Sequence, residues 1–258
     1  MKDLILHQIY KTASIVEDAV DFGVSLDLTN KKDLVFARQR ASSFHKETLL
    51  HLFIKQEFIN HYYHFFTRMT DSVCDEDIEL EFLEEQFNYY DVAIDFLKIK
   101  HDENDYPITT NSQIIRWYNQ NKNKFIALSE KIYDEIFFII FSNRKVLHTF
   151  NENLASSFDQ FKFDKNQLSK KGTLKRKNVP IWLQRAAFHR DKGRCSFCWK
   201  DVGDLINLDT RKNFDHIIPL DLFGVNDPTN IQLVCKECNL KKLNKSTDVG
   251  TKYQEWFV

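Results

Sequence analysis

Four of the five cysteines form two Cys-x-x-Cys pairs in the last quarter of the chain. The first pair is Cys195 and Cys198, the second is Cys235 and Cys238, and 36 residues lie between them. Each pair can present two thiolates to one ion, and two pairs complete the closed tetrahedral shell of a structural zinc site. An iron–sulfur cluster also uses four cysteines, but nothing else in the sequence favours electron transfer. The spacing therefore predicts one structural zinc ion, and Cys74 is expected to be an ordinary thiol.

An acid and a histidine stand side by side between the two pairs, as Asp215 and His216 in "NFDHIIPLDLFG". Residues 213–220 read as a short buried strand, in which a charged pair has little structural purpose. A histidine can accept a proton from water near neutral pH, and a carboxylate is a hard ligand for a divalent cation. Neighbours on a regular strand point to opposite faces, so the strand must bend or end at His216 for both to serve one centre. Pro219 favours such an ending. Activated water and a bound cation are what phosphodiester hydrolysis requires.

The second cysteine pair continues into "LVCKECNLKKLNK", which has the composition of a helix. In a helix Cys235, Cys238, Asn239 and Lys242 share one face, because they are spaced by three, four and seven residues. Zinc would then fix the start of the helix, while Asn239 and Lys242 extend along the hairpin that carries the acid and the histidine. The amide oxygen of Asn239 is a second hard donor suited to Mg²⁺.

Taken together, "CSFC…FDHIIPL…TNIQLVCKECNLKK" resembles the HNH endonucleases of the four-cysteine kind, which have the ββα-metal fold. The preceding "WLQRAAFHRDKGRC" resembles the helix and Arg-Asp turn that lead into the first pair in that family. The resemblance covers about residues 180–245. It implies that His216 is the general base and that Asp215 and Asn239 hold Mg²⁺ or Mn²⁺. It also implies that Asn230 braces the loop and orients the histidine.

The two parts of the chain carry opposite charge. Residues 161–258 contain 19 Lys and Arg against 11 Asp and Glu, whereas residues 1–160 contain 17 against 26. A basic part suits a polyanionic partner, and DNA is the expected one. Phosphate contacts are expected from Lys175, Arg176, Lys177, Arg211, Lys212, Lys241 and Lys242. Two rival interpretations are a non-catalytic, zinc-stabilised nucleic-acid-binding protein and an RNA-cleaving nuclease.

The predicted organisation has three parts. Apolar residues at three-and-four spacing recur in residues 46–69, 75–100 and 123–150, as in amphipathic helices. We therefore predict a mainly α domain over residues 1–158, a basic linker over 159–179, and a small α+β domain over 180–258. The last would have the ββα-metal (HNH) fold with structural zinc.

The helical domain is expected to act in recognition, regulation or oligomerisation, through a homodimer contact or a partner protein. Within it, "RASSFH" at 40–45 matches the Arg-x4-His spacing of HEPN-type ribonucleases, which is a short pattern. The longest apolar run, "IFFIIF" at 136–141, is far shorter than the ~20 residues of a membrane span. The start lacks the features of a signal peptide, so a cytoplasmic protein without membrane contact is expected. By analogy with the family, the setting would be prokaryotic defence against foreign DNA.

Overall fold

The structure is a computed structural model that describes residues 2–68, 74–104, 108–202 and 214–242. By packing, the chain divides into two compact units. Unit 1 comprises Met1–Val16 and Phe53–Ile139, and unit 2 comprises Glu17–Leu52 and Ile140–Val258. No described helix combines the length and the hydropathy that crossing a bilayer requires.

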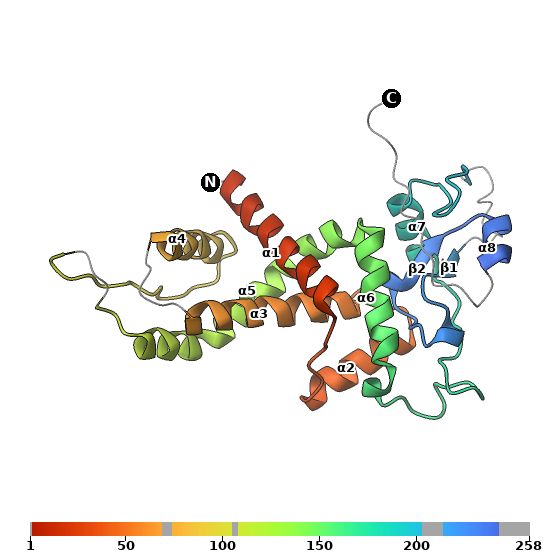
Figure 1. Cartoon of the computed structure of the whole chain (residues 1–258), viewed down its shortest axis with the longest axis horizontal. Coiled ribbons are helices and arrows are strands. Elements are labelled where there is room, and N and C mark those ends of the chain that lie inside the picture. Colours follow the sequence, from red (N-terminus) through yellow and green to blue (C-terminus); the bar gives the residue numbers. More distant parts are fainter. Residues whose placement is uncertain (1, 69–73, 105–107, 203–213, 243–258) are drawn as a thin grey trace. The chain divides into compact units, whose positions relative to one another are not determined.

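The regular elements are mostly helices (Figure 1). The α-helices are α1 (Lys2–Phe22), α2 (Lys31–Ser42), α3 (Leu49–Arg68), α4 (Cys74–Tyr89), α5 (Asn111–Phe141), α6 (Arg144–Ser156), α7 (Ile181–Arg190) and α8 (Lys236–Lys242). The strands are β1 (Phe214–His216) and β2 (Ile231–Leu233). Six of the described helices precede residue 158, which confirms the prediction of a mainly helical N-terminal region.

The predicted helical run over residues 123–150 is divided between α5 and α6. Asn143 accepts a hydrogen bond from the backbone N–H of Val146 at 3.3 Å and so caps the start of α6. Within α6, Val146, Phe150 and Leu154 recur every four residues and are all buried. The apolar period therefore predicts the helical faces correctly, but the cap at Asn143 starts a new helix.

Unit 1 has an aromatic core. The ring of Phe66 on α3 stacks on Tyr118 of α5, with ring centroids 5.3 Å apart. Phe87 on α4 meets Phe125 of α5 edge-on at 5.1 Å. Such ring pairs add to the stabilisation from apolar burial and prefer these tilted or offset geometries. The Phe and Tyr residues of the helical sequences thus join three helices of unit 1.

The helical pattern over residues 75–100 is only half right, because α4 ends at Tyr89 and residues 92–100 are neither helix nor strand. Asp91 follows the helix with a positive φ of 53° and ends it. After it, Val92 and Phe96 are buried and the residues around them are mainly exposed. This alternation fits an extended chain with one inward face.

Unit 2 contains a ββα module, which we define as β1, β2, α8 and the residues between them (Figure 1). The strands pair antiparallel, with Phe214 opposite Leu233 and His216 opposite Ile231. α8 follows β2 after two residues, and α7 packs on β2. The predicted α+β fold at the C-terminal end is confirmed.

Residues 159–179, predicted to be a linker, pack within unit 2. Arg38 of α2 donates from Nε to the carbonyl oxygen of Phe161 at 3.1 Å. Leu168 and Leu174 form an isolated antiparallel bridge, and Leu174 is buried. The division of the chain at residues 158 and 179 stays a prediction about its modules, whereas packing joins residues 17–52 to 140–258.

Candidate metal centre and hydrolytic site

The four clustered thiols converge. The sulfur atoms of Cys195, Cys198, Cys235 and Cys238 all lie within 4.8 Å of one another. Cys198 Sγ and Cys235 Sγ, which come from different pairs, are 3.7 Å apart. A tetrahedron with zinc–sulfur bonds of about 2.3 Å has edges of about 3.8 Å, so the residues present fit a zinc ion.

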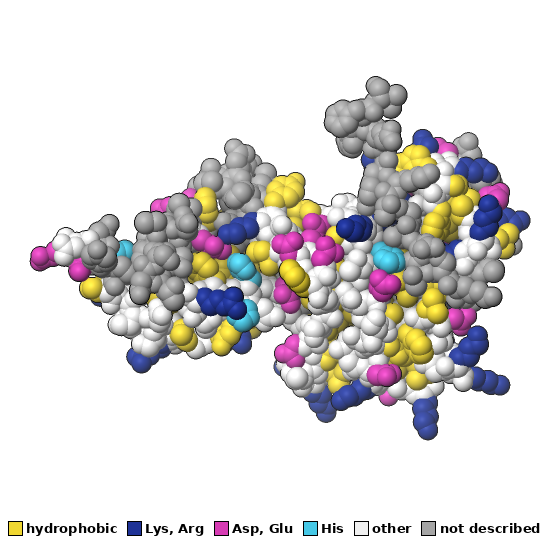
Figure 2. All heavy atoms as spheres, in the orientation of Figure 1, with side chains coloured by type: hydrophobic (Ala, Val, Ile, Leu, Met, Phe, Trp, Pro, Cys, Tyr) yellow, Lys and Arg dark blue, Asp and Glu magenta, His cyan; other side chains and the backbone are white. Residues whose placement is uncertain are grey.

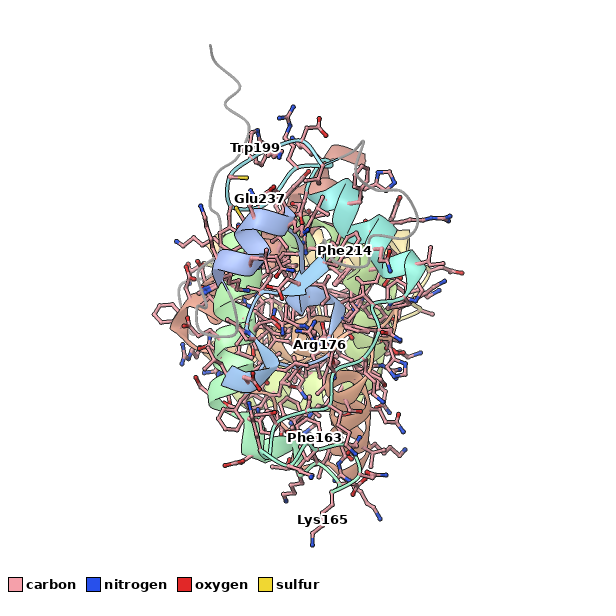
Figure 3. All side chains as sticks on the ribbon, turned by 90° about the vertical axis from the view of Figure 1, so that its right-hand side faces the viewer. Phe163, Lys165, Arg176, Trp199, Phe214 and Glu237 are labelled. Atoms are coloured by element: carbon pink, nitrogen blue, oxygen red, sulfur yellow. The ribbon has the colours of Figure 1, made fainter. Side chains whose placement is uncertain are left out.

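Backbone geometry shapes the first pair into a metal-binding turn. The N–H of Cys195 donates to the carbonyl of Lys200 at 2.9 Å, and the N–H of Trp199 donates to the carbonyl of Cys195 at 3.0 Å. Trp199 has a φ of 65°, which turns the chain back after the second thiol. In Figure 3, Trp199 and Glu237 mark the turn after the first pair and the start of α8 within the second. The two turns therefore bring their thiols together.

The pKa values of the thiols reflect their surroundings. Burial raises the pKa of Cys238 to about 11, which favours its protonated form in the absence of an ion. For Cys195, burial is outweighed by backbone N–H groups at the sulfur, and the pKa is lowered. Metal binding would therefore release protons from this cluster.

An ion pair at the end of α7 ties that helix to the hairpin. Arg190 binds the carboxylate of Asp191 through two hydrogen bonds of 2.9 and 2.8 Å, and both side chains are buried. Asp191 Oδ2 also accepts the backbone N–H of Leu233 at 2.9 Å, while Arg190 donates to the carbonyl of Ile231 at 2.7 Å. The Arg-Asp turn of the sequence thus positions β2, which leads directly into Cys235.

His216 is the last residue of β1, so the strand ends where the sequence argument requires and is shorter than the predicted strand over residues 213–220. Its side chain is almost completely buried, with 1% of its surface exposed, and the ring lies 6.2 Å from that of Phe44. Nε2 lies 3.3 Å from Oδ1 of Asn226. Within the described residues Nδ1 has no hydrogen-bond partner. A buried nitrogen without a partner costs about 1–3 kcal/mol, which makes Nδ1 a candidate for contact with water or a ligand.

The imidazole of His216 is neutral at physiological pH. Burial lowers its pKa to about 4, and the positive charge of Arg176 acts in the same direction. The carboxylate of Asp215 and the hydrogen bond to Asn226 act in the opposite direction but are outweighed. A neutral ring keeps one nitrogen lone pair available for a proton.

Asn230 braces the loop that connects the two strands. Its Oδ1 accepts the N–H of Ile218 at 2.8 Å, and its Nδ2 donates to the carbonyls of Ile218 and Val225 at 3.0 and 2.9 Å. The loop is tight, because a Cβ at Gly224 would lie 2.0 Å from the carbonyl oxygen of Ile218. The side chain that meets the imidazole of His216 is Asn226, not Asn230.

Asn226 and Asp227 are two fully buried polar residues that the sequence argument did not single out. Asp227 Oδ2 accepts the N–H of Leu49, the first residue of α3, at 2.8 Å. Its Oδ1 accepts the backbone N–H and the hydroxyl of Thr229 at 2.9 and 2.6 Å. "VNDP" has the composition of an ordinary turn, so nothing in it signals contacts to residues that lie far away along the chain.

The side chain of Lys242 is buried against Asp215. Its Nζ lies 2.9 Å from Asp215 Oδ2 and 2.8 Å from the carbonyl of Ile217, and it also contacts the carbonyl of His216. Lys242 was predicted to contact phosphate, whereas here its ammonium neutralises the carboxylate beside the histidine. Asn239 stands three residues earlier on α8 and is partly buried. Residues three apart are neighbours on a helix surface, so Asn239 shares the side of α8 from which Lys242 reaches Asp215.

The remaining predicted basic residues lie at the surface or outside the described residues. Lys175, Arg176, Lys177 and Lys241 are exposed, whereas Arg211 and Lys212 lie outside the described part of the chain. Lys and Arg side chains gather at the right-hand edge of Figure 2, over unit 2. An open hollow of about 510 Å³ is lined by residues that include Lys170, Lys171, Lys175, Arg176 and Asp221. Figure 3 labels Arg176 and Phe214, and the charge of Arg176 reaches His216, which lies on the same strand as Phe214.

Arg40 and His45, which match the Arg-x4-His spacing, have separate local partners. Arg40 forms an ion pair with Glu47 at 3.1 Å. His45 Nε2 lies 3.0 Å from the hydroxyl of Ser43.

Residues 195–245 match the family model described as HNH endonuclease. The matched segment holds the four cysteines, both strands and α8, so the resemblance seen in the sequence is confirmed for this part of the chain. No curated protein matches the chain. No solved structure matches it either. The match supports a nuclease or nucleic-acid-binding role for the C-terminal region.

Proposed function

We propose that the protein is a metal-dependent endonuclease that hydrolyses the phosphodiester bonds of DNA. The observation that carries this proposal is His216, a neutral and buried histidine whose Nδ1 has no partner among the described residues. Such a nitrogen can take the proton of an attacking water molecule. In this proposal Nδ1 is the general base, and the oxygen of the water attacks phosphorus.

The donors for a divalent cation would be Asp215 and Asn239. A carboxylate and an amide oxygen are hard ligands of the kind that Mg²⁺ and Mn²⁺ prefer. When bound, the cation would supply charge stabilisation at the phosphorus oxygens and at the leaving oxygen. Lys242 already neutralises Asp215, so the ammonium must share or yield this carboxylate when the site is loaded.

The four thiols would hold a zinc ion with a structural role. The closed set of four sulfur ligands leaves no position for water, which is the pattern of structural sites. Cys235 immediately precedes α8, and Asn239 lies within that helix. The zinc would therefore fix the helix that carries one of the proposed cation ligands.

Phosphate binding would fall to the exposed basic residues around the hollow. Arg176 is exposed and its charge acts on His216, so it stands where a phosphate at the site would be met. Lys175, Lys177 and Lys241 would add contacts to the backbone, and we keep Arg211 and Lys212 in the same proposed group. Each such contact is independent of sequence and weakens with salt.

Cleavage of a supercoiled plasmid tests the proposal. The wild-type protein should nick or linearise the plasmid with Mg²⁺ or Mn²⁺ and should be inactive with a chelator. His216→Ala should lower the rate by a factor on the order of 10²–10⁴, the usual contribution of a general base, while DNA affinity is retained. His189→Ala is the matched control, because His189 is an exposed histidine on α7. Cleavage by His216→Ala at the parental rate would contradict the mechanism.

Two alternatives have distinct outcomes in the same experiment. A non-catalytic, zinc-stabilised nucleic-acid-binding protein would retard DNA on a gel and leave it intact under every metal condition. An RNA-cleaving nuclease would cut labelled RNA faster than DNA of the same sequence. The proposal commits to DNA because the resemblance is to HNH endonucleases and because the exposed basic groups suit a nucleic-acid backbone.

We further propose a role in prokaryotic defence against foreign DNA, in the cytoplasm. Bacteria that express the wild-type protein should then resist phage infection better than bacteria that express His216→Ala. Equal plaque numbers with both proteins would contradict the role in defence and leave the nuclease proposal standing.

A further inference from the structure

Asn226 is a fully buried amide that joins His216 to the end of α2. Its Oδ1 lies 3.3 Å from Nε2 of His216. Its Nδ2 donates to the carbonyls of Ser42 and Lys175 at 3.2 and 3.0 Å. Its backbone N–H donates to the carbonyl of Ala41 at 2.8 Å. The two Nδ2 contacts fix the direction of the side-chain amide, the backbone bond anchors the main chain, and the fourth contact is to the histidine.

The contacts determine which way the amide faces. Backbone carbonyls only accept hydrogen bonds, so the NH₂ group of Asn226 must face Ser42 and Lys175. Oδ1 must then face His216, and an amide oxygen also only accepts. The hydrogen between them therefore belongs to Nε2 of the neutral imidazole. Since one nitrogen of a neutral imidazole carries the proton, Nδ1 is left with the lone pair.

We propose that Asn226 is a positioning residue that sets the tautomer of His216 and so leaves Nδ1 free to act as the base. This inference rests on the proposed function of His216. The opposite tautomer would place a hydrogen on Nδ1, and that nitrogen could not accept a proton from water. Among the described residues no second hydrogen bond reaches the imidazole of His216, so Asn226 alone sets this choice.

Helix α2 helps to hold Asn226 in this orientation. The last carbonyls of a helix have no partners within it. Two of those of α2, at Ala41 and Ser42, are satisfied by Asn226. Both residues are buried, so their carbonyls depend on protein donors. α2 lies more than 150 residues before the family-matched segment, yet it holds the amide that orients the base.

Nuclear magnetic resonance of ¹⁵N-histidine-labelled protein tests the tautomer directly at neutral pH. The chain has nine histidines, and the signals of His216 are identified by their loss in His216→Ala. In the wild-type protein Nε2 should give a pyrrole-type shift and Nδ1 a pyridine-type shift. Asn226→Leu, which keeps the approximate volume but cannot accept a hydrogen bond, should give averaged or exchanged shifts.

Asn226→Asp separates the tautomer from simple stability. A carboxylate also accepts from Nε2–H, so His216 should keep the wild-type tautomer. The same substitution removes both donors to the carbonyls of Ser42 and Lys175, so both variants should melt at lower temperature than the wild type. Only the leucine variant should change the nitrogen shifts, a difference that a purely structural role for Asn226 would not produce.

Kinetics with saturating DNA complete the test. Asn226→Leu should lower kcat by a factor on the order of ten to a hundred, part of the contribution of a general base, with little change in the Kd for DNA. Asn153→Leu is the matched control, because Asn153 likewise donates to a helix-end carbonyl, that of Val20 at 3.1 Å. The control should keep both the tautomer and kcat.

The outcomes distinguish this inference from the proposed function. A wild-type His216 with its hydrogen on Nδ1, or an Asn226→Leu protein with unchanged shifts, would overturn the role of Asn226 even if His216→Ala abolishes cleavage. The expected shifts in a protein that cuts no nucleic acid would overturn the nuclease proposal and leave the relation between Asn226 and His216 intact.

Discussion

The two ends of the ββα module are held by different chemistry. At one end Cys235 and Cys238 face Cys195 and Cys198, which precede the module, and the four thiols lie within 4.8 Å of one another in a cluster suited to a zinc ion. At the other end Asn226, Asp227 and Thr229 of the strand connection are fully buried and bind the rest of unit 2 through hydrogen bonds. Asn226 bonds to the end of α2, Asp227 to the start of α3, and Thr229 to Asn151 of α6.

The difference separates the thiol end, which lies wholly within the family-matched segment, from the hydrogen-bonded end, whose partners lie outside it. All four thiols lie within residues 195–245, the segment that matches the family model. The partners of the other end lie at Ala41, Leu49 and Asn151, far from that segment in sequence. A metal can thus stabilise the first end by itself, whereas the second end requires the helices.

Loss of zinc should have the largest effect. Cys235→Ser, or a strong chelator, should unfold the ββα module, because metal affinity in such small domains contributes about 10–16 kcal/mol to folding. Elemental analysis of the purified wild-type protein should find one zinc per chain. Cys74→Ser is the matched control and should keep both the zinc and the melting temperature. A fully folded, metal-free Cys235→Ser protein would contradict the role of the thiols.

Removal of the helices should be nearly as severe. A fragment of residues 166–258 lacks α2, α3 and α6, so Asn226 and Asp227 lose their buried partners. Because unpaired buried polar groups are costly, the fragment should bind zinc but should not hold the His216 end in place. Spectroscopic melting and plasmid cleavage of the zinc-loaded fragment and the full chain give the comparison. A fragment that cuts as fast as the full chain would show that the module is independent of the helices.

Lys242→Met should destabilise the metal-free protein and increase its response to divalent cations. Breaking a buried ion pair leaves Asp215 without its partner, which costs about 3–5 kcal/mol. A cation bound at that carboxylate should restore part of the loss. Melting temperature with and without Mn²⁺ measures both effects. Lys241→Met, an exposed lysine on the same helix, should change neither, and an equal Mn²⁺ response in both variants would speak against Asp215 as a cation ligand.

Asp227→Ala should cost about 2–3 kcal/mol of the free energy of unfolding. The substitution leaves the N–H of Leu49 and two groups of Thr229 without their acceptor. Asp221→Ala provides the control, because the pair that Asp221 forms with Lys171 at 3.4 Å is at the surface and contributes little. Urea unfolding of the two variants measures the difference, and equal midpoints would show that Asp227 does not support the hydrogen-bonded end.

The smallest expected effect is a dependence on pH. Burial raises the pKa of Asp227 above its usual value near 3.8, so the folded state binds this proton more tightly than the unfolded state. The stability from this group is therefore present below the unfolded pKa and is lost as pH rises through the folded pKa. The free energy of unfolding of the wild type should fall relative to Asp227→Asn over that window. A constant difference across the acid range would contradict the raised pKa.

The sequence predicts the thiol end of the module but does not predict the hydrogen-bonded end, for a physical reason. Metal ligation imposes a fixed spacing on Cys195, Cys198, Cys235 and Cys238, which is visible in a single sequence. Buried hydrogen bonds impose no spacing, so Asn226 looks like any residue of a turn. Lys242 illustrates the same limit, because a lysine near a predicted site suggests phosphate contact, while only the fold brings it to Asp215.

The apolar spacing predicts which face of each helix is buried. It does not predict where each helix begins or ends. α6 follows its apolar spacing closely, with Phe150 and Leu154 inward. The period could not locate the cap at Asn143, nor the change from helix to extended chain after Tyr89. A cap depends on one side chain and one N–H, and an extended segment depends on the surface that it covers, so neither has a periodic signature.

The hydrogen bond from Asn226 to the carbonyl of Ala41 affects which segments of this chain can be exchanged with those of a related protein. A chimera that receives residues 195–245 from a relative keeps its own α2, whose terminal carbonyls still require donors. A donor module without an amide at the position of Asn226 would fold around its zinc and leave the histidine free to rotate. We therefore expect such a chimera to fold but to lose the proposed activity, unless α2 is exchanged together with the segment.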